Sequence, residues 1–548
     1  MRPVPILLAL GLLATPSFAA DRYLVATRKA SRNVELRMVR ESGEFRAHAV
    51  RAFEAVDAFA ADLTSDEVAA LRRSPEVRFV TPTVERHLLS DSAPLHASSN
   101  GSAYRATQTL PDGLRMIHAT ELWQYTRGAG PINVVTFDTG IDTKHPDLAA
   151  NYAGGYNTFT QTDDPTDDNG HGTHVAGTIA AVDNNFGVVG VAPQARIWSV
   201  KVLDRTGFGL DENLVAGADW IIAKKRAIGG DWILNCSLGA SLNSPIEEEA
   251  FKRVIAEGIV VVAATGNRGI DQVEFPAGYD GVIAVGAVDS TSTLATFSDH
   301  GPRMGVVAPG VRVLSTARAG SIAAAGVTLD NGPTFPAAAL VGSSRGEFTA
   351  PFVACGLGNP QDFPASVRGN IALVKRGSIT FNQKVRNAEA AGAVAVVIYN
   401  YNDTDNLNFW TLLRPDCQNI DGCDDPTHPW PVVLGINAAD GDRLLADPTR
   451  KMDMGAWFDD YTIASGTSMA APHVSGTLAL LWSLAPEAKP DRLRDALRST
   501  AVDLGAPGFD ELYGYGMINA FAAAVRFAPA VFHATPPKRE PSEPRRSP

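Results

Sequence analysis

Short apolar runs alternate with longer helix-like segments from about Ile132 onwards, and this alternation constrains the fold more than any other feature. The runs consist mostly of Val, Ile, Leu and Ala and lie at 133–137, 197–203, 232–236, 259–264 and 282–285. Helices are predicted between them at 212–226 and 244–257. Apolar strands separated by helices indicate a parallel sheet that is covered on both faces. The sequence therefore predicts an α/β domain.

The α/β pattern is interrupted in the second half of the chain. From about Ala317 to Asp459, clusters of Gly, Pro and Asn surround a separate strand-helix-strand run at 370–400. Helical patterns then resume, with helices predicted at 468–484 and 491–500. We therefore expect an inserted domain that divides the α/β domain into two parts.

The N-terminus has the pattern of an exported precursor. Arg2 precedes an apolar run at 6–13, and Pro16 and small residues around Phe18 follow, which is typical of a cleaved signal peptide over 1–19. The run is too short to span a membrane, which needs about 20 apolar residues. We expect a secreted protein, extracellular or periplasmic.

Three further regions flank the α/β pattern. Residues 22–90 combine β-rich patches with a predicted helix that Ser65 can cap and that has Glu67 in its first turn, as in a small α+β unit. The segment 91–106 is rich in Ser, Ala, Asn and His and is predicted to be an exposed, cleavable linker. The Pro-rich, charged residues 531–548 predict a flexible tail.

Charge and cysteine content exclude several classes of partner. The 48 Lys and Arg residues against 60 Asp and Glu give a net charge of −12, so no basic field is available for nucleic acid or an anionic membrane. The four cysteines, Cys236, Cys355, Cys417 and Cys423, could pair in three ways in an oxidising compartment. Their spacing lacks paired CxxC motifs, so a structural zinc site is not expected.

Three segments carry the residue types that hydrolysis by a serine requires. Asp138 ends a predicted buried strand, His171 lies in the motif GHGTH, and Ser468 lies in GTSMA at the start of a predicted helix. Singly, each is explained as well by a turn, a loop or an N-cap. Together, in the order Asp, His, Ser, they match an orienting carboxylate, a proton acceptor and a nucleophile. The pair His171 and His174 does not favour catalytic zinc, because the zincin motif is HExxH.

These motifs resemble those of the subtilisin-like serine proteases (subtilases) over both parts of the α/β domain. The resemblance implies a three-layer α/β fold and a serine endopeptidase that forms an acyl-enzyme on Ser468, without a catalytic metal. It also implies that Asp138 orients His171, the general base and acid. Asn267, in the run AATGN, matches the oxyanion-hole amide of the family.

The flanking regions resemble accessory domains of the same family. Residues 22–90, which contain FVTP near their end, are similar to the inhibitory propeptide, implying assisted folding, self-cleavage and temporary inhibition. The insert resembles a protease-associated (PA) domain through RGNIALVKRG and AAGAVAVVIYN, which implies gating of access or binding of protein substrates, although its charges also suit an ordinary solvated face. The predicted order is signal peptide, inhibitory propeptide, linker, first catalytic part, PA-like insert, second catalytic part and tail, at 1–19, 22–90, 91–106, 107–316, 317–459, 460–530 and 531–548.

The resemblance places the substrate as an added β-strand between two glycine-containing segments. The substrate-binding residues implied are Gly207, Phe208, Gly209, Ser237, Leu238, Gly239 and Gly266. Main-chain pairing of this kind predicts broad specificity. Glu274 falls near the base of the primary specificity pocket, where a carboxylate would favour Lys or Arg; a solvent-facing Glu274 is the other interpretation.

The resemblance also implies a structural calcium site. The ligands would be side-chain oxygens of Gln108, Asp147 and Asn184 and carbonyl oxygens of Val182, Phe186 and Val188. Six or more oxygens suit a hard cation such as Ca²⁺. An ordinary surface loop rich in Asn and Gly is the alternative.

Two alternative functions remain open at this stage. The expected partners are protein and peptide substrates and the chain's own propeptide, and a processing protease with few targets is a narrower form of the same prediction. A catalytically silent peptide-binding or adhesion protein belongs to a different class. Retention of Asp138, His171, Asn267 and Ser468 argues against it, because binding needs none of their chemistry.

Overall fold

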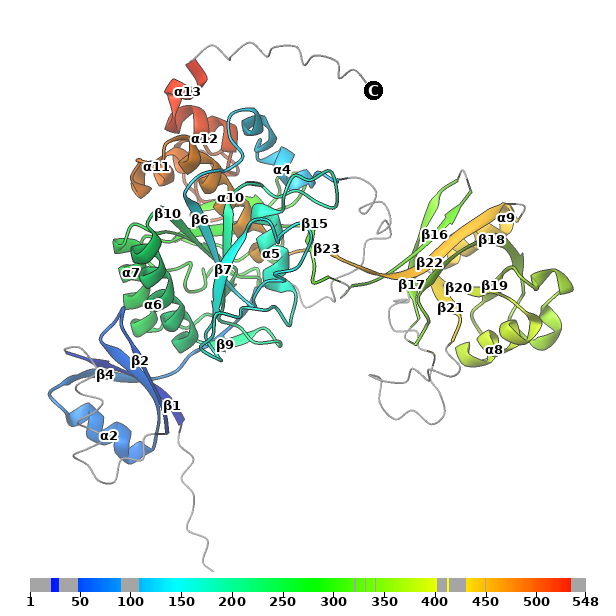
Figure 1. Cartoon of the computed structure of the whole chain (residues 1–548), viewed down its shortest axis with the longest axis horizontal. Helices are drawn as coiled ribbons and strands as arrows, with labels where there is room; N and C mark the ends of the chain where they lie inside the picture. The colour runs from blue at the N-terminus through cyan, green and yellow to red at the C-terminus, as the bar shows by residue number, and fades with distance from the viewer. Residues whose placement is uncertain are drawn as a thin grey trace, which may run out of the picture.

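The computed structural model describes residues 21–28, 48–89, 108–319, 322–330, 332–340, 342–401, 412, 430–448 and 450–533. A central α/β domain has a small α+β domain against one side and a β-barrel beside the other (Figure 1). Among these residues, none of the helices combines the length and apolarity that crossing a bilayer would require.

A seven-stranded sheet forms the middle layer of the central domain, and every neighbouring pair in it is parallel. Its strands, in spatial order, are β14 (Val306–Pro309), β13 (Ile283–Val288), β12 (Val260–Ala264), β10 (Asp231–Cys236), β6 (Ile132–Asp138), β8 (Arg196–Lys201) and β7 (Tyr152–Asn157). Apart from the half-buried edge strand β7, the strands are buried on both faces, which explains their mostly apolar sequence. The predicted parallel sheet is confirmed.

Helices cover both faces of this sheet and create two apolar cores. Along β6, Ile132 and Val134 join one core, whereas Val135 and Phe137 join the other, because successive side chains point to opposite faces. The helices of the first core are α5 (His171–Ala180), α10 (Thr467–Leu484), α11 (Pro490–Thr500) and α12 (Ala520–Phe527). Those of the second are α6 (Asp211–Ile228) and α7 (Pro245–Ala256). The three-layer α/β fold is therefore as predicted.

The N-terminal α+β domain packs its antiparallel sheet against α6 and α7. The sheet order is β2-β3-β1-β4, from β1 (Asp21–Thr27), β2 (His48–Phe53), β3 (Ala58–Leu63) and β4 (Val77–Pro82), with α2 (Ser65–Arg73) connecting β3 to β4. The prediction that Ser65 caps α2 is wrong. Thr64 has the extended backbone of a cap and forms a capping box with Glu67, while Ser65 is already helical.

The insert is a closed barrel that joins the central α/β domain through a narrow neck (Figure 1). Its strands are β16 (Ile322–Leu329), β17 (Thr334–Ala339), β18 (Gly346–Ala354), β19 (Ile371–Lys375), β20 (Ala395–Tyr399), β21 (Val432–Ile436) and β22 (Lys451–Asp459). Helices α8 (Phe381–Ala391) and α9 (Ala438–Ala446) pack beside it. At the neck, β15 (Val313–Thr316) and β23 (Tyr461–Ala464) pair antiparallel.

Short helices complete the described chain. They are α4 (Asp112–Met116), η1 (Thr120–Gln124), η2 (Pro360–Asp362), η3 (Ala365–Val367) and α13 (Pro529–His533). Residues 531–533, which were predicted to belong to the flexible tail, are part of α13. The predicted signal peptide, the linker at 91–106 and residues 534–548 lie outside the described residues.

Candidate active site

The predicted catalytic residues converge on the carboxyl edge of the parallel sheet. Asp138 ends β6, Ser237 directly follows β10, and Asn267 follows β12, and these three strands are neighbours. His171 begins α5, which packs against α10, the helix that carries Ser468. Sites in open α/β sheets form at this edge because loops from adjacent strands meet there.

Asp138 and His171 form a direct, buried contact. The Nδ1 of His171 lies 2.8 Å from Asp138 Oδ1, and both side chains are almost completely shielded from solvent. Asp138 Oδ1 also accepts a hydrogen bond from the N–H of Thr139 at 2.7 Å. The other ring nitrogen of His171, Nε2, has no hydrogen-bond partner among the described residues. The carboxylate therefore fixes the ring and leaves Nε2 available as a proton acceptor.

The hydroxyl of Ser468 is buried at the start of α10 but does not contact the imidazole. It donates to the carbonyl oxygen of Ser237 at 2.9 Å, while the hydroxyl of Ser237 donates to the carbonyl of Ser468 at 2.8 Å. Ser468 is the second residue of the helix, after Thr467, and not the first as predicted. To bond His171 Nε2, the hydroxyl must turn about its Cα–Cβ bond.

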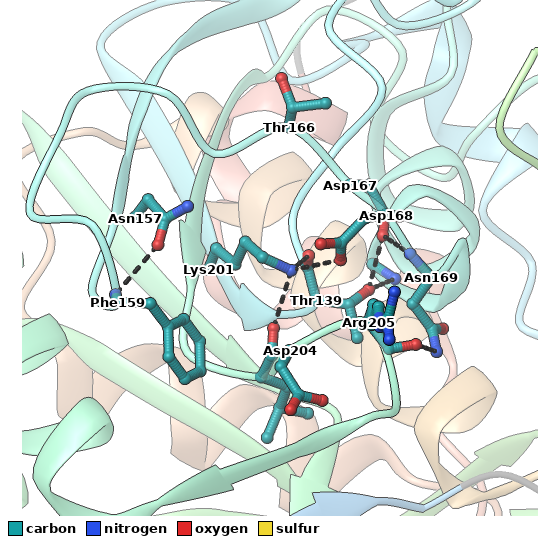
Figure 2. Close-up of polar contacts among 12 residues, drawn as sticks. Thr139, Asn157, Phe159, Thr166, Asp167, Asp168, Asn169, Lys201, Asp204 and Arg205 are labelled. Carbon is teal, nitrogen blue, oxygen red and sulfur yellow. Dashed lines mark hydrogen bonds and ion pairs between the residues drawn. The ribbon is translucent and has the colours of Figure 1, made fainter.

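A carboxylate that the sequence analysis did not single out, Asp167, holds the loop in front of His171 (Figure 2). Its oxygens accept hydrogen bonds from the hydroxyl of Thr139 (2.9 Å), the N–H of Gly170 (2.9 Å) and the hydroxyl of Thr173 (2.6 Å). The position of Asp167 before the first turn of α5 was the available signal, since acidic residues satisfy free N–H groups at helix starts.

Lys201 ties the same loop to the sheet (Figure 2). Its buried ammonium group donates to Asp168 Oδ1 at 2.6 Å and to the carbonyl oxygens of Thr139 and Leu203 at 2.7 and 2.9 Å. The segments on either side of the Asp138–His171 pair are thus cross-linked by charged hydrogen bonds, which restrict the pair to one geometry.

The side chain of Asn267 is held by α10 and directed at a peptide carbonyl. Its Oδ1 accepts hydrogen bonds from the N–H and the hydroxyl of Thr467 at 2.9 and 2.8 Å. Its Nδ2 donates to the carbonyl oxygen of Leu89, the last described residue of the N-terminal domain. Thr467 lies within the GTSMA motif, but no role of its own was predicted for it.

The end of the N-terminal domain occupies the groove that was predicted to bind substrate. Strand β5 (Glu85–Leu88) lies between β9 (Phe208–Leu210) and β11 (Leu238–Gly239) and runs antiparallel to both. The register pairs Arg86 with Gly209 and His87 with Gly239, and the N–H of Leu88 donates to the carbonyl of Gly207 at 3.1 Å. The two glycine-containing segments therefore do bracket an added strand. Gly266 also lies at this edge, where its N–H donates to the Thr467 hydroxyl at 3.3 Å.

Glu274 lies inside the groove wall, so a solvent-facing Glu274 is wrong. The carboxyl group is 1% exposed and pairs with Arg268 at 3.1 Å. Burial raises the pKa of Glu274 to about 7, against the opposing effect of Arg268. A methyl group placed on Gly239 would lie 2.8 Å from Glu274 Oε2 and 3.0 Å from the side chain of Leu89. Glu274 therefore stands beside the pocket that holds Leu89, with much of its charge balanced by Arg268.

The predicted calcium ligands are neighbours in the structure. The side-chain amide of Gln108 bonds the carbonyl oxygens of Val182 and Val188 at 2.9 and 3.3 Å, and the amide of Asn184 bonds Asp147 Oδ1 at 2.9 Å. Burial raises the pKa of Asp147. Rotating either amide by half a turn would present oxygen in place of nitrogen.

The donor set of this loop suits a hard cation that offsets the buried carboxylate of Asp147. Phe186 N–H donates to Asn184 Oδ1 at 3.0 Å, which closes the loop. In the described part of the chain, no cluster of three or more His, Cys, Asp or Glu side chains could hold a metal ion, so the other candidate donors here are amide and main-chain oxygens.

Two cysteines and one further histidine are buried away from solvent and have no predicted catalytic role. Cys236 and Cys355 are buried and free, and burial raises the pKa of the Cys236 thiol well above its usual value, which opposes a nucleophilic role. Cys417 and Cys423 lie outside the described residues. The ring of His174 contacts the carbonyl of Val313 at 3.1 Å, and burial lowers the pKa of His174 to about 3.

Three sequence families match consecutive parts of the chain. The family described as "Subtilase family" matches residues 132–344, "PA domain" matches 348–444, and "Peptidase inhibitor I9" matches 19–89. The insert and the N-terminal domain are therefore a PA domain and an inhibitor-type propeptide, as the sequence predicted.

Individual relatives support the same assignment. A thermostable alkaline protease of Halalkalibacterium halodurans is 35% identical over 311 residues, which cover 56% of this chain and 78% of that protein. Subtilisin E of Bacillus subtilis is 36% identical over 303 residues, covering 54% and 73%. The crystal structure of the subtilisin-like protease Apa1 from the Antarctic psychrotroph Pseudoalteromonas sp. AS-11 has a TM-score of 0.50 at 32% identity, covering 76% and 98%. Fervidolysin from Fervidobacterium pennivorans, at 22% identity and a TM-score of 0.57, covers 92% of this chain and 61% of its own and resembles it in fold.

Proposed function

The chain belongs to the subtilase family and is a serine endopeptidase, and on that premise we propose that Ser468, His171 and Asp138 form its catalytic triad. The proposal rests on the Asp138–His171 contact, in which Nε2 of the same ring has no hydrogen-bond partner among the described residues. Ser468 lies nearby, in the first turn of α10. A silent binding protein would have no use for this arrangement.

The reaction follows from these positions. Ser468 Oγ attacks the peptide carbonyl carbon while His171 Nε2 takes the hydroxyl proton, and Asp138 stabilises the resulting imidazolium. The amide of Asn267 donates to the oxyanion of the tetrahedral intermediate. Collapse of the intermediate breaks the C–N bond, His171 protonates the leaving amine, and Ser468 retains the acyl group. A water molecule, deprotonated by His171, then releases the acid and restores the serine hydroxyl.

We further propose that the enzyme cleaves its own precursor after Leu89. The support is that the Asn267 amide, the proposed oxyanion donor, bonds the carbonyl oxygen of Leu89. The paired strand β5 lies where the acyl side of a substrate would lie. After cleavage, β5 would remain paired in the groove and inhibit the enzyme as a bound product. Dissociation of the propeptide would then release activity.

Two further parts of the proposal rest on the sequence and on local chemistry. The predicted signal peptide at 1–19 supports secretion of the precursor, to the medium or the periplasm. The loop at 182–188, with Gln108 and Asp147, would hold Ca²⁺, which would neutralise the buried carboxylate and fix the loop against the N-terminal segment of the catalytic domain.

Intact-mass analysis of wild type beside Ser468→Ala tests the proposal. Wild type should lose the propeptide up to Leu89, whereas Ser468→Ala should retain it. A serine-directed fluorophosphonate should label the wild-type protein and a matched control, Ser499→Ala, whose hydroxyl lies on α11 and bonds only within that helix. Labelling of Ser468→Ala, or self-cleavage by it, would refute the assignment.

A further inference from the structure

An arginine of the propeptide is completely buried inside the groove wall. The side chain of Arg86 is 0% exposed, and its Nε donates to Glu247 Oε2 at 2.9 Å, while Nη1 donates to the carbonyl oxygen of Glu85 at 3.0 Å. Glu247 is equally inaccessible. Nη2 has no hydrogen-bond partner among the described residues. An arginine is seldom fully buried unless it is paired, so this position indicates a pocket that accepts a guanidinium.

Glu247 bonds this guanidinium directly, and Asp211 and Tyr279 interact with it electrostatically; we call these three residues of the catalytic domain the acidic pocket. Asp211 is the first residue of α6, and Glu247 lies in the first turn of α7. The hydroxyl of Tyr279 donates to Glu247 Oε1 at 3.1 Å. Both carboxylates thus stand at helix N-termini, which favour negative charge.

The charges of the pocket and of Arg86 depend on each other. Burial raises the pKa of Glu247 to about 7 and raises the pKa of Asp211, and in both cases Arg86 opposes the shift. Burial lowers the pKa of Arg86, but Glu247 and Asp211 outweigh it, so the net pKa of Arg86 is raised. Arg86 therefore stabilises the charged form of both carboxylates.

Arg86 leaves the pocket when the propeptide leaves. A buried carboxylate without its cation is strongly destabilised, and a second cation of the same shape recovers that cost. Leu89 carries the carbonyl that Asn267 contacts, so Arg86 is the fourth residue before the proposed cleaved bond. A substrate strand in the same register would place its own fourth residue against Glu247.

We propose that the acidic pocket is a specificity site that selects arginine at the fourth residue before the cleaved bond in protein and peptide substrates. This inference rests on the proposed function, because it needs the groove to bind substrates as it binds β5. Arginine is favoured over lysine because a guanidinium donates in a plane to both the carboxylate and the adjacent main-chain carbonyl, as Arg86 does. The pocket adds a sequence requirement to a groove that otherwise recognises main chain.

Peptide substrates that lack the propeptide's fold test the proposal. The p-nitroanilide of Glu-Arg-His-Leu-Leu, the sequence of residues 85–89, would be compared with peptides in which Arg is replaced by Lys, Ala or citrulline. Citrulline keeps the size and planarity of arginine but lacks the charge. With the enzyme matured from the full-length precursor, kcat/KM for the Arg peptide should exceed that for the citrulline peptide about 10- to 100-fold.

Variants of the pocket provide the second measurement. Glu247→Gln should remove most of the preference for arginine, so that the ratio of kcat/KM for the Arg and citrulline peptides falls towards 1. The matched control is Glu248→Gln, because Glu248 is adjacent on α7 but bonds Lys252 at the surface. If Glu247→Gln does not fold, the peptide comparison on the wild-type enzyme still decides the question.

The outcomes separate this inference from the proposed function. Hydrolysis of all four peptides with similar kcat/KM would overturn the specificity site and leave the endopeptidase mechanism intact, and Arg86 would then serve only to anchor the propeptide. Absence of hydrolysis of every peptide, with no fluorophosphonate labelling, would overturn the proposed function itself. A preference for arginine that Glu248→Gln removes and Glu247→Gln preserves would also refute the assignment.

Discussion

Thr467 should act on catalysis only through Asn267, and a double-mutant cycle can measure this. The Thr467 hydroxyl is one of two donors that hold Asn267 Oδ1, and with Oδ1 held, Nδ2 faces the carbonyl of Leu89. Asn267→Leu removes the oxyanion donor and should lower kcat about 10²- to 10³-fold. Thr467→Val removes one neutral hydrogen bond, about 1 kcal/mol, or about 5-fold in kcat.

The informative result is the double variant. If Thr467 only positions Asn267, then Thr467→Val in the Asn267→Leu background should cost less than about 2-fold in kcat. Each variant would be matured with immobilised wild-type enzyme, which is then removed, and assayed on one p-nitroanilide peptide. The control is Thr477→Val on the same helix, whose hydroxyl bonds His473 O within α10. Thr477→Val should leave kcat unchanged.

A further 5-fold loss in the double variant would refute the reasoning, because Thr467 would then act on the transition state by another route. A fall in Tm would not by itself explain a loss of kcat. Thr467→Val also removes contacts of the hydroxyl with Gly266, so part of its effect on Tm should persist without Asn267. Coupling in kcat that is larger than the coupling in Tm is therefore the expected signature of a positioning residue.

Three other predictions follow from the same contacts. Leu89→Asp places a second carboxylate beside Glu274 and should slow self-cleavage at least about 10-fold. The rate would be measured by intact-mass analysis at successive times, and an unchanged rate would contradict the proposed register. Removal of Ca²⁺ with EGTA should lower the Tm of wild type by about 5–10 °C, and Asp147→Asn should abolish that difference; an equal response in both would exclude the site. Burial raises the pKa of Glu247, to about 7 with Arg86 in place, so the carboxylate is neutralised as pH falls. The ratio of kcat/KM for the Arg and citrulline peptides should therefore decrease from pH 8 to pH 6, whereas effects on the triad cancel in the ratio; a constant ratio would contradict this.

The fold could be predicted because it depends on local pattern, whereas the roles of Asp138, His171 and Asn267 were implied by motifs that resemble those of the subtilases. Apolar runs of strand length, separated by helical segments, indicate a parallel sheet, and such a sheet collects the ends of its strands at one edge. Asp138 ends β6 and Asn267 follows β12 as the pattern required. The helix that carries Ser468 was also predicted to within one residue.

Contacts between distant segments could not be predicted in the same way. The burial of Glu274 depends on contacts with Arg268 and with Gly239 in the groove wall. The periodicity of the sequence does not predict contacts of this kind. The orientation of the Ser468 hydroxyl depends on the carbonyl of Ser237, which lies between β10 and β11. The capping of α2 was misassigned by one position because Thr64 and Ser65 have the same capping chemistry, and only the backbone conformation distinguishes them.

The propeptide contacts the catalytic domain in two separate ways, and this has a consequence for activation. Its sheet packs on α6 and α7, where Arg22 pairs with Glu212 at 2.9 Å and the N–H groups of Glu54 and Ala55 donate to Asp219. Its last strand, β5, fills the groove through main-chain pairing and through Arg86.

Cleavage after Leu89 breaks neither set of contacts, so the cleaved propeptide should stay bound. The two sets are joined by the short segment between β4 and β5, and each therefore raises the effective concentration of the other. Weakening the acidic pocket alone should speed release of the propeptide only in part, because the sheet contact still holds it. Weakening the acidic pocket and the sheet contact together should speed release by more than either change alone. If the proposals hold, the groove has to bind arginine tightly enough to inhibit in the precursor, yet loosely enough, once the sheet contact is lost, to exchange β5 for a substrate.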